Sequence, residues 1–115
     1  MIRRHKDMSV VEAVRLKNGN GEASIINILE TGEMYGAGRL FCITKMKPGV
    51  SSGAHTHTGD FETYYILKGQ ARVRQRNVLR AWTWDMLQCK DGDFHGIESI
   101  GEEELEYLAV IMYSR

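Results

Sequence analysis

The chain has 115 residues, the usual size of one domain with one hydrophobic core. Its 15 basic and 15 acidic residues give a formal net charge of +0, so no overall field attracts nucleic acid or an anionic membrane. The sequence contains no apolar run of about 18 residues that could span a membrane, and its start, MIRRHKDMSVVEAV, is charged where a signal peptide needs an apolar core. We therefore expect a single domain over residues 1–115, a cytoplasmic location, and a small, roughly neutral molecule as the partner.

Glycine, rather than proline, divides the chain into short segments. The first, SVVEAVRL (9–16), places Ser9 and Glu12 at capping-box spacing, which would suit one helical turn. Its three valines favour an extended arm packed on the rest of the domain. Later segments are rich in β-branched and aromatic residues and predict strands over 40–46, 62–68, 71–78, 86–90 and 105–113. Regular short strands separated by turn signals indicate an all-β sandwich or barrel.

Two of these segments predict how their strands are buried. ARVRQR (71–76) alternates small or apolar residues with charged ones, as a half-buried strand does. LEYLAVIMY (105–113) is apolar at both parities, which predicts coverage on both faces and suggests a dimer. Cys42 and Cys89 lie inside apolar runs at no metal-motif spacing, so we expect both to be buried, reduced thiols.

Two of the four histidines lie one residue apart in PGVSSGAHTHTGDFETYYILKG (48–69). Alternate side chains of a strand share a face, so His55 and His57 point the same way and Thr56 points the other way. TGD (58–60) is a turn signal, after which Glu62 can return a carboxylate to the same pocket. Two imidazoles and a carboxylate suit a first-row transition ion and leave coordination positions open.

A third histidine lies farther along the chain. His95, in KDGDFHGIE, follows a second glycine-bearing turn, where a neighbouring strand could bring it to the same ion. His5, in the charged segment RRHKD, is expected to be an ordinary surface residue. We predict one divalent transition-metal ion per chain, Mn, Fe, Ni, Co, Cu or Zn, bound by His55, His57, Glu62 and His95.

This stretch resembles the first sequence motif of the cupin superfamily, G-x5-H-x-H-x3,4-E-x6-G. The five matching residues are Gly49, His55, His57, Glu62 and Gly69. The resemblance covers about residues 40–112 and implies a small single-domain cupin: an antiparallel jelly-roll β-barrel, here with an N-terminal arm. It also implies a homodimer, in agreement with the excess of apolar residues in 105–113 and in LRAWTW (79–84).

The second cupin motif, G-x5-P-x-G-x2-H-x3-N, is matched in part, by Gly92 and His95. Trp84, Lys90 and Ser99 stand where Gly, Pro and Asn are typical. A glycine at the first of these positions serves a bend that a tryptophan is poorly suited to adopt at positive φ. The segment RNVLRAWTWDM also lacks an Asn-Gly or Asp-Gly turn. We therefore expect an irregular connection between residues 75 and 87.

An octahedral ion held by four side chains keeps about two positions for water or substrate. The resemblance implies two reaction classes: dioxygenase-type oxidation of a small enolic or phenolic substrate, which we place first, or metal-dependent isomerisation or lyase chemistry of the sugar type. Isomerisation needs a base, for which Tyr64 is the candidate catalytic residue because it shares the parity of Glu62, although it also suits a core position. The alternative to an enzyme is a module that binds a small, carbohydrate-like ligand.

Overall fold

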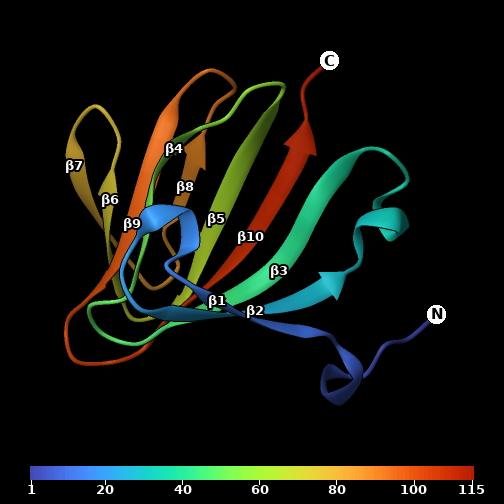
Figure 1. Cartoon of the computed structure of the whole chain (residues 1–115), viewed down its shortest axis with the longest axis horizontal. Coiled ribbons are helices and arrows are strands. Elements are labelled where there is room, and N and C mark those ends of the chain that lie inside the picture. Colours follow the sequence, from blue (N-terminus) through green and yellow to red (C-terminus); the bar gives the residue numbers. More distant parts are fainter.

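The computed structural model describes all residues, 1–115, and consists almost entirely of antiparallel strands (Figure 1). The strands are β1 (Val10–Val14), β2 (Glu22–Leu29), β3 (Gly38–Met46), β4 (Ser51–Thr56), β5 (Asp60–Lys68), β6 (Gln70–Arg74), β7 (Val78–Trp82), β8 (Met86–Cys89), β9 (Phe94–Ile100) and β10 (Leu105–Tyr113). The only helical segments are the 3-10 turns η1 (His5–Asp7), η2 (Leu16–Asn18) and η3 (Thr31–Met34). No helix of the chain has the length and apolar character needed to cross a bilayer.

The strands form two sheets, one of six strands in the order β1-β2-β3-β10-β5-β8 and one of four in the order β4-β9-β6-β7. Figure 1 shows the four-stranded sheet facing the β5 and β10 side of the larger one. The core fills the space between them, where Met46, Ile66 and Leu105 of the larger sheet and Val73 and Ile97 of the smaller one are almost fully buried. This architecture confirms the predicted small jelly roll.

The N-terminal segment is an extended arm, as its valines predict, and not a helical turn. β1 pairs antiparallel with β2, with Val10 opposite Ile26. The two side chains at capping-box spacing bond elsewhere. Ser24 Oγ donates to Glu12 at 2.7 Å, and Ser9 Oγ donates to Glu30 at 2.8 Å. The side chains of Ser9 and Glu12, which would have capped a helix, therefore form hydrogen bonds with Glu30 and Ser24 instead.

The prediction of one strand over 71–78 is wrong. The chain turns at residues 75–77, so that Arg74 of β6 pairs with Val78 of β7 in a hairpin. Gln75 N–H donates to Asn77 O at 3.0 Å across the turn. The turn consists of Gln, Arg and Asn and contains no glycine. The alternation of apolar and charged residues therefore predicted one continuous strand across it.

Trp84 takes the backbone conformation expected of the glycine that it replaces, with φ at 73°. The connection from β7 to β8 crosses from one sheet to the other, so these strands form no hairpin. Trp84 N–H donates to Ile66 O at 2.8 Å, and Asp85 accepts a bond from Trp82 N–H at 2.8 Å. These bonds hold a tryptophan in the left-handed region, which L side chains rarely occupy.

β10 lies between β3 and β5 at the centre of the larger sheet. Its burial alternates: Leu105, Tyr107, Ala109 and Ile111 are buried, and the residues between them are half-buried. Within one chain, therefore, only one face of β10 is fully buried, and the other face is only partly covered.

Both cysteines, Cys42 and Cys89, are free and buried, as predicted.

Candidate metal centre

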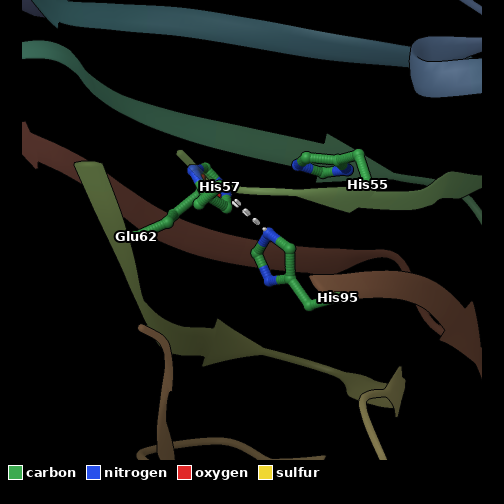
Figure 2. A group of neighbouring side chains, drawn as sticks. All are labelled: His55, His57, Glu62 and His95. Atoms are coloured by element: carbon green, nitrogen blue, oxygen red, sulfur yellow. Dashed lines mark hydrogen bonds and ion pairs between the residues drawn. The ribbon is translucent and has the colours of Figure 1, made fainter. Parts of the chain in front are cut away.

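The predicted ligands meet between the two sheets (Figure 2). His55 on β4 is directly opposite His95 on β9 in the smaller sheet, and His57 lies one residue beyond the end of β4. Glu62 comes from β5 of the larger sheet. One ligand atom from each of the four residues lies within 4.8 Å of the others. The fold thus brings the four predicted ligands together.

The donor atoms of three of these residues converge closely. His57 Nε2 lies 3.1 Å from His95 Nε2 and 3.2 Å from Glu62 Oε1, and His95 Nε2 lies 3.1 Å from the same carboxylate oxygen. Metal–ligand bonds of about 2.1 Å place neighbouring donors about 3.0 Å apart in an octahedron and about 3.4 Å apart in a tetrahedron. Two imidazole lone pairs face each other at such distances only with a proton or a cation between them. The cluster therefore fits a metal ion.

Hydrogen bonds orient two of the imidazoles. His55 Nδ1–H donates to Gly53 O at 2.9 Å, and His57 Nδ1–H donates to Asp60 Oδ1 at 2.6 Å. Arg39 Nε donates to the other oxygen of Asp60 at 2.8 Å. Because Nδ1 of both histidines is used in a hydrogen bond, Nε2 is the nitrogen available to bind a metal. Hydrogen bonds of this kind commonly orient the histidine ligands of metal sites.

The ionisation of the cluster follows from its burial and its hydrogen bonds. Burial raises the pKa of the Glu62 carboxyl, but hydrogen bonds from His57 and His95 outweigh it and lower the pKa to about 2. The hydrogen bond to Glu62, aided by Asp60, raises the pKa of His57, whereas burial lowers the pKa of His55. Glu62 is therefore an ionised carboxylate, ready to coordinate.

Tyr64 lies beside the cluster, as its parity predicts. Its hydroxyl donates to Glu62 Oε1 at 3.1 Å, and its ring stacks on His95 with centroids 5.2 Å apart. Burial and the neighbouring Glu62 charge raise the pKa of Tyr64 well above 10. A phenol that stays protonated can donate a hydrogen bond but cannot accept a proton as a base.

A cavity of about 220 Å³ opens on His55, His57 and Glu62. Its other walls are largely apolar, with Leu40, Ala109 and Ile111 among them. Lys17 and Arg39 also line it. The volume is about seven times the roughly 30 Å³ that one water molecule occupies in the liquid, so the cavity suits a small ligand.

Sequence reasoning missed three charged residues here, Lys17, Arg39 and Asp60. Asp60 was assigned to a turn, whereas it begins β5 and shares the inward parity of Glu62, which is the signal that could have revealed it. Lys17 and Arg39 come from η2 and β3, and no local motif connects them with the histidines. His5 lies in the exposed turn η1, outside the cluster, as predicted.

A jelly roll that brings three histidines and a glutamate together beside a cavity has the layout of a β-barrel able to hold a metal ion. Residues 42–111 match the cupin domain family, and the chain belongs to that family.

Known relatives agree with this assignment. An oxalate-binding protein of Thermotoga maritima is 33% identical over 113 residues, covering 97% of this chain and 93% of that protein. The crystal structure of a predicted oxalate decarboxylase from Thermotoga maritima superposes with a TM-score of 0.94 at 32% identity, covering 99% of this chain and 100% of that one. A polyketide cyclase from Streptomyces resistomycificus shares the fold, with a TM-score of 0.77 at 20% identity, covering 100% of this chain and 82% of that one.

Proposed function

We propose that this chain binds one divalent transition-metal ion through His55, His57, Glu62 and His95, and that a small oxygen-donor molecule completes the coordination. The observation that carries the proposal is the approach of three donor atoms to 3.1–3.2 Å of one another beside a cavity of about 220 Å³. A bound ion would supply Lewis acidity and, if it is redox-active, electron exchange. Four protein ligands leave an octahedral ion about two positions.

Oxalate is the first ligand to test, because a relative at 33% identity is an oxalate-binding protein. Its two carboxylates can occupy two adjacent positions of one ion. The roles of the chain's own residues follow from their contacts: Asp60 and Gly53 orient two imidazoles, and Tyr64 holds the Glu62 carboxylate.

For chemistry beyond binding, we propose dioxygen-dependent oxidation of a small substrate, because an open site of histidine and carboxylate ligands suits non-haem oxygenation. Isomerisation receives less support, since the hydroxyl of its candidate base, Tyr64, is buried and already donates to Glu62.

Metal replacement separates these functions. Metal-free protein is reloaded with iron(II), manganese(II) or zinc, and oxalate binding, oxygen consumption and product formation from enediols and phenols are measured together. Oxidation predicts oxygen uptake with the redox ions only, because zinc has no redox chemistry. Product formed without oxygen at similar rates with zinc and manganese would favour isomerisation. Ligand binding without turnover of any substrate would favour a binding module.

We also propose that two copies associate through an apolar patch formed by Tyr65, Trp82, Trp84 and Met86. These residues are 39%, 48%, 65% and 61% exposed. Trp82 ends the edge strand β7 and Met86 begins the edge strand β8. Tyr65 on β5 is opposite Met86, and its ring lies 5.9 Å from that of Trp84. Exposed aromatic clusters of this kind are typical of interfaces. Light scattering at micromolar concentration should give the mass of a dimer, and Trp82→Lys should give that of a monomer. A wild-type monomer contradicts the proposal.

A further inference from the structure

The loop between β1 and β2 contains two asparagines that are each followed by glycine, in the sequence NGNG (18–21). Both Asn18 and Asn20 are exposed. A following glycine favours deamidation, because it has no side chain to hinder the attack of its nitrogen on the asparagine side chain. We propose that Asn20 is a self-modification site, which deamidates in the folded protein, whereas the fold protects Asn18.

The reaction is an intramolecular substitution at the side-chain amide of Asn20. The main-chain nitrogen of Gly21 loses its proton to water or hydroxide and forms a bond to Cγ of Asn20. The Cγ–Nδ2 bond breaks, and the leaving nitrogen takes up a proton and departs as ammonia. Water then opens the succinimide ring. Attack at Cγ gives aspartate, and attack at the main-chain carbonyl carbon gives isoaspartate. The reaction needs no metal, so it is independent of the proposed function.

The nitrogens of the two glycines differ in their hydrogen bonds. Gly19 N–H donates to Leu16 O at 2.9 Å, so this nitrogen keeps its proton until the bond opens. Gly21 N–H donates to no acceptor in the structure. Gly21 is also exposed, with φ at 72°, a conformation that glycine adopts without strain. Attack by Gly21 on Asn20 therefore requires no hydrogen bond of its nitrogen to open.

The carbonyl group between Asn20 and Gly21 is hydrogen-bonded in a way that favours the reaction. Asn20 O accepts a hydrogen bond from Ser51 N–H at 2.9 Å. When Gly21 N loses its proton, amide resonance spreads the negative charge onto this oxygen. A hydrogen bond to an oxygen that gains negative charge stabilises that charge. The bond from Ser51 therefore stabilises the form of the peptide group that attacks.

Asn20 lies where its loop is fastened to β4. Its N–H donates to Ser51 Oγ at 2.9 Å, and its carbonyl accepts from Ser51 N–H. A Cβ atom on Gly53 would lie 1.9 Å from Lys17 O, and Figure 1 shows the blue segment containing η2 beside β4. We call this contact the seat of η2 on β4. Isoaspartate lengthens the main chain by one carbon, so residue 20 would no longer make both bonds to Ser51.

The test follows deamidation in the intact protein. Wild type, Asn20→Gln and Asn18→Gln are incubated at physiological temperature in isotopically labelled water, so that only modification during the incubation is counted. Glutamine is the blocking residue because it would have to form a larger, less favourable ring. The tryptic peptide 18–39 contains both asparagines and an internal control, Asn27, which is followed by the bulky Ile28. Tandem mass spectrometry locates the label, and the incubation is repeated in urea.

We expect Asn20 of folded wild type to take up label about 2- to 10-fold faster than Asn18, the factor by which one backbone hydrogen bond lowers the population of the open form. In urea the two rates should become similar, because the bond from Gly19 N–H is then broken. Asn20→Gln should remove most of the label, and Asn18→Gln should not. Asn27 should remain unlabelled in the folded protein.

Modification should also weaken the seat. Aged wild type that contains isoaspartate at residue 20 should unfold at a lower urea concentration than fresh protein, whereas Asn20→Gln should unfold at the same concentration before and after ageing. Equal labelling of Asn18 and Asn20 in the folded protein, or no labelling of Asn20, would overturn the proposal. A preference of the same size in urea would also overturn it, because the preference would then belong to the sequence and not to the fold. Aged wild type that carries isoaspartate but unfolds like fresh protein would refute the weakening of the seat.

Discussion

At the scale of single residues, Trp84 shows how a family motif can change its residue and keep its geometry. Its φ of 73° is the conformation for which a glycine is usually selected. Its ring lies 5.9 Å from that of Tyr65, so an exposed aromatic contact accompanies the strain.

Comparing Trp84→Gly with Trp84→Ala isolates the backbone strain, because both substitutions remove the ring and differ only in the Cβ atom. We expect the glycine variant to have the higher free energy of unfolding, by about 1 kcal/mol. Urea unfolding at one protein concentration provides the measurement. An alanine variant as stable as the glycine variant would show that residue 84 does not hold positive φ.

The low pKa of Glu62 predicts that the folding stability of the metal-free protein decreases in acid. The folded pKa of Glu62, about 2, is below the ordinary value of 4.5, so the unfolded chain takes up its proton first as the pH falls. The stability that Glu62 contributes is fully present above about pH 4.5 and is lost as the pH falls towards 2. Glu62→Gln removes this contribution.

The difference in unfolding free energy between wild type and Glu62→Gln should therefore shrink as the pH falls from 5 through 4 to 3 in the presence of chelator. Urea titrations at these pH values measure it. A difference that is constant across this range would mean that Glu62 is not ionised and hydrogen-bonded as described.

At the scale of elements, the seat of η2 on β4 depends on backbone contact. Gly53→Ala would place a Cβ 1.9 Å from Lys17 O, whereas Gly32→Ala would place one in open space, with nothing within 4 Å. We expect Gly53→Ala to lower the free energy of unfolding by about 1–3 kcal/mol, the range for overpacking. The matched control Gly32→Ala should change it little.

The same Gly53→Ala variant should also bind oxalate more weakly, because displacing the backbone at residue 53 moves the carbonyl that orients His55. Urea unfolding and calorimetry test the two effects. Wild-type stability in Gly53→Ala would contradict the close approach of the two segments.

Strand prediction succeeded where burial and periodicity agree. β5 and β10 have dense β-branched and aromatic residues between glycines, and both were predicted within two residues of their bounds. The β6–β7 hairpin was missed because its turn, residues 75–77, contains no glycine or proline. Local propensity cannot show a turn that long-range pairing creates.

At the scale of the whole molecule, three of the four ligands, His55, His57 and Glu62, were predictable because a strand and a turn fix their spacing locally. His95 was predicted from a second glycine-bearing turn, and the pairing of β4 with β9 brings it opposite His55. Lys17 and Arg39 were not, because only the closure of the jelly roll brings η2 and β3 to the histidines. The position of Asp60 was available from parity alone, but its role depends on Arg39 reaching it from β3. The full lining of the cavity is thus a property of the assembled fold.

The central claim is that one transition-metal ion sits in the cluster of His55, His57, Glu62 and His95. Elemental analysis of protein purified without a histidine tag tests it directly, in wild type, His57→Ala and the control His5→Ala. We predict close to one transition ion per chain in wild type and His5→Ala and little in His57→Ala, because His57 supplies a donor atom. Metal content that is equal in all three proteins, or negligible in wild type, would contradict the claim.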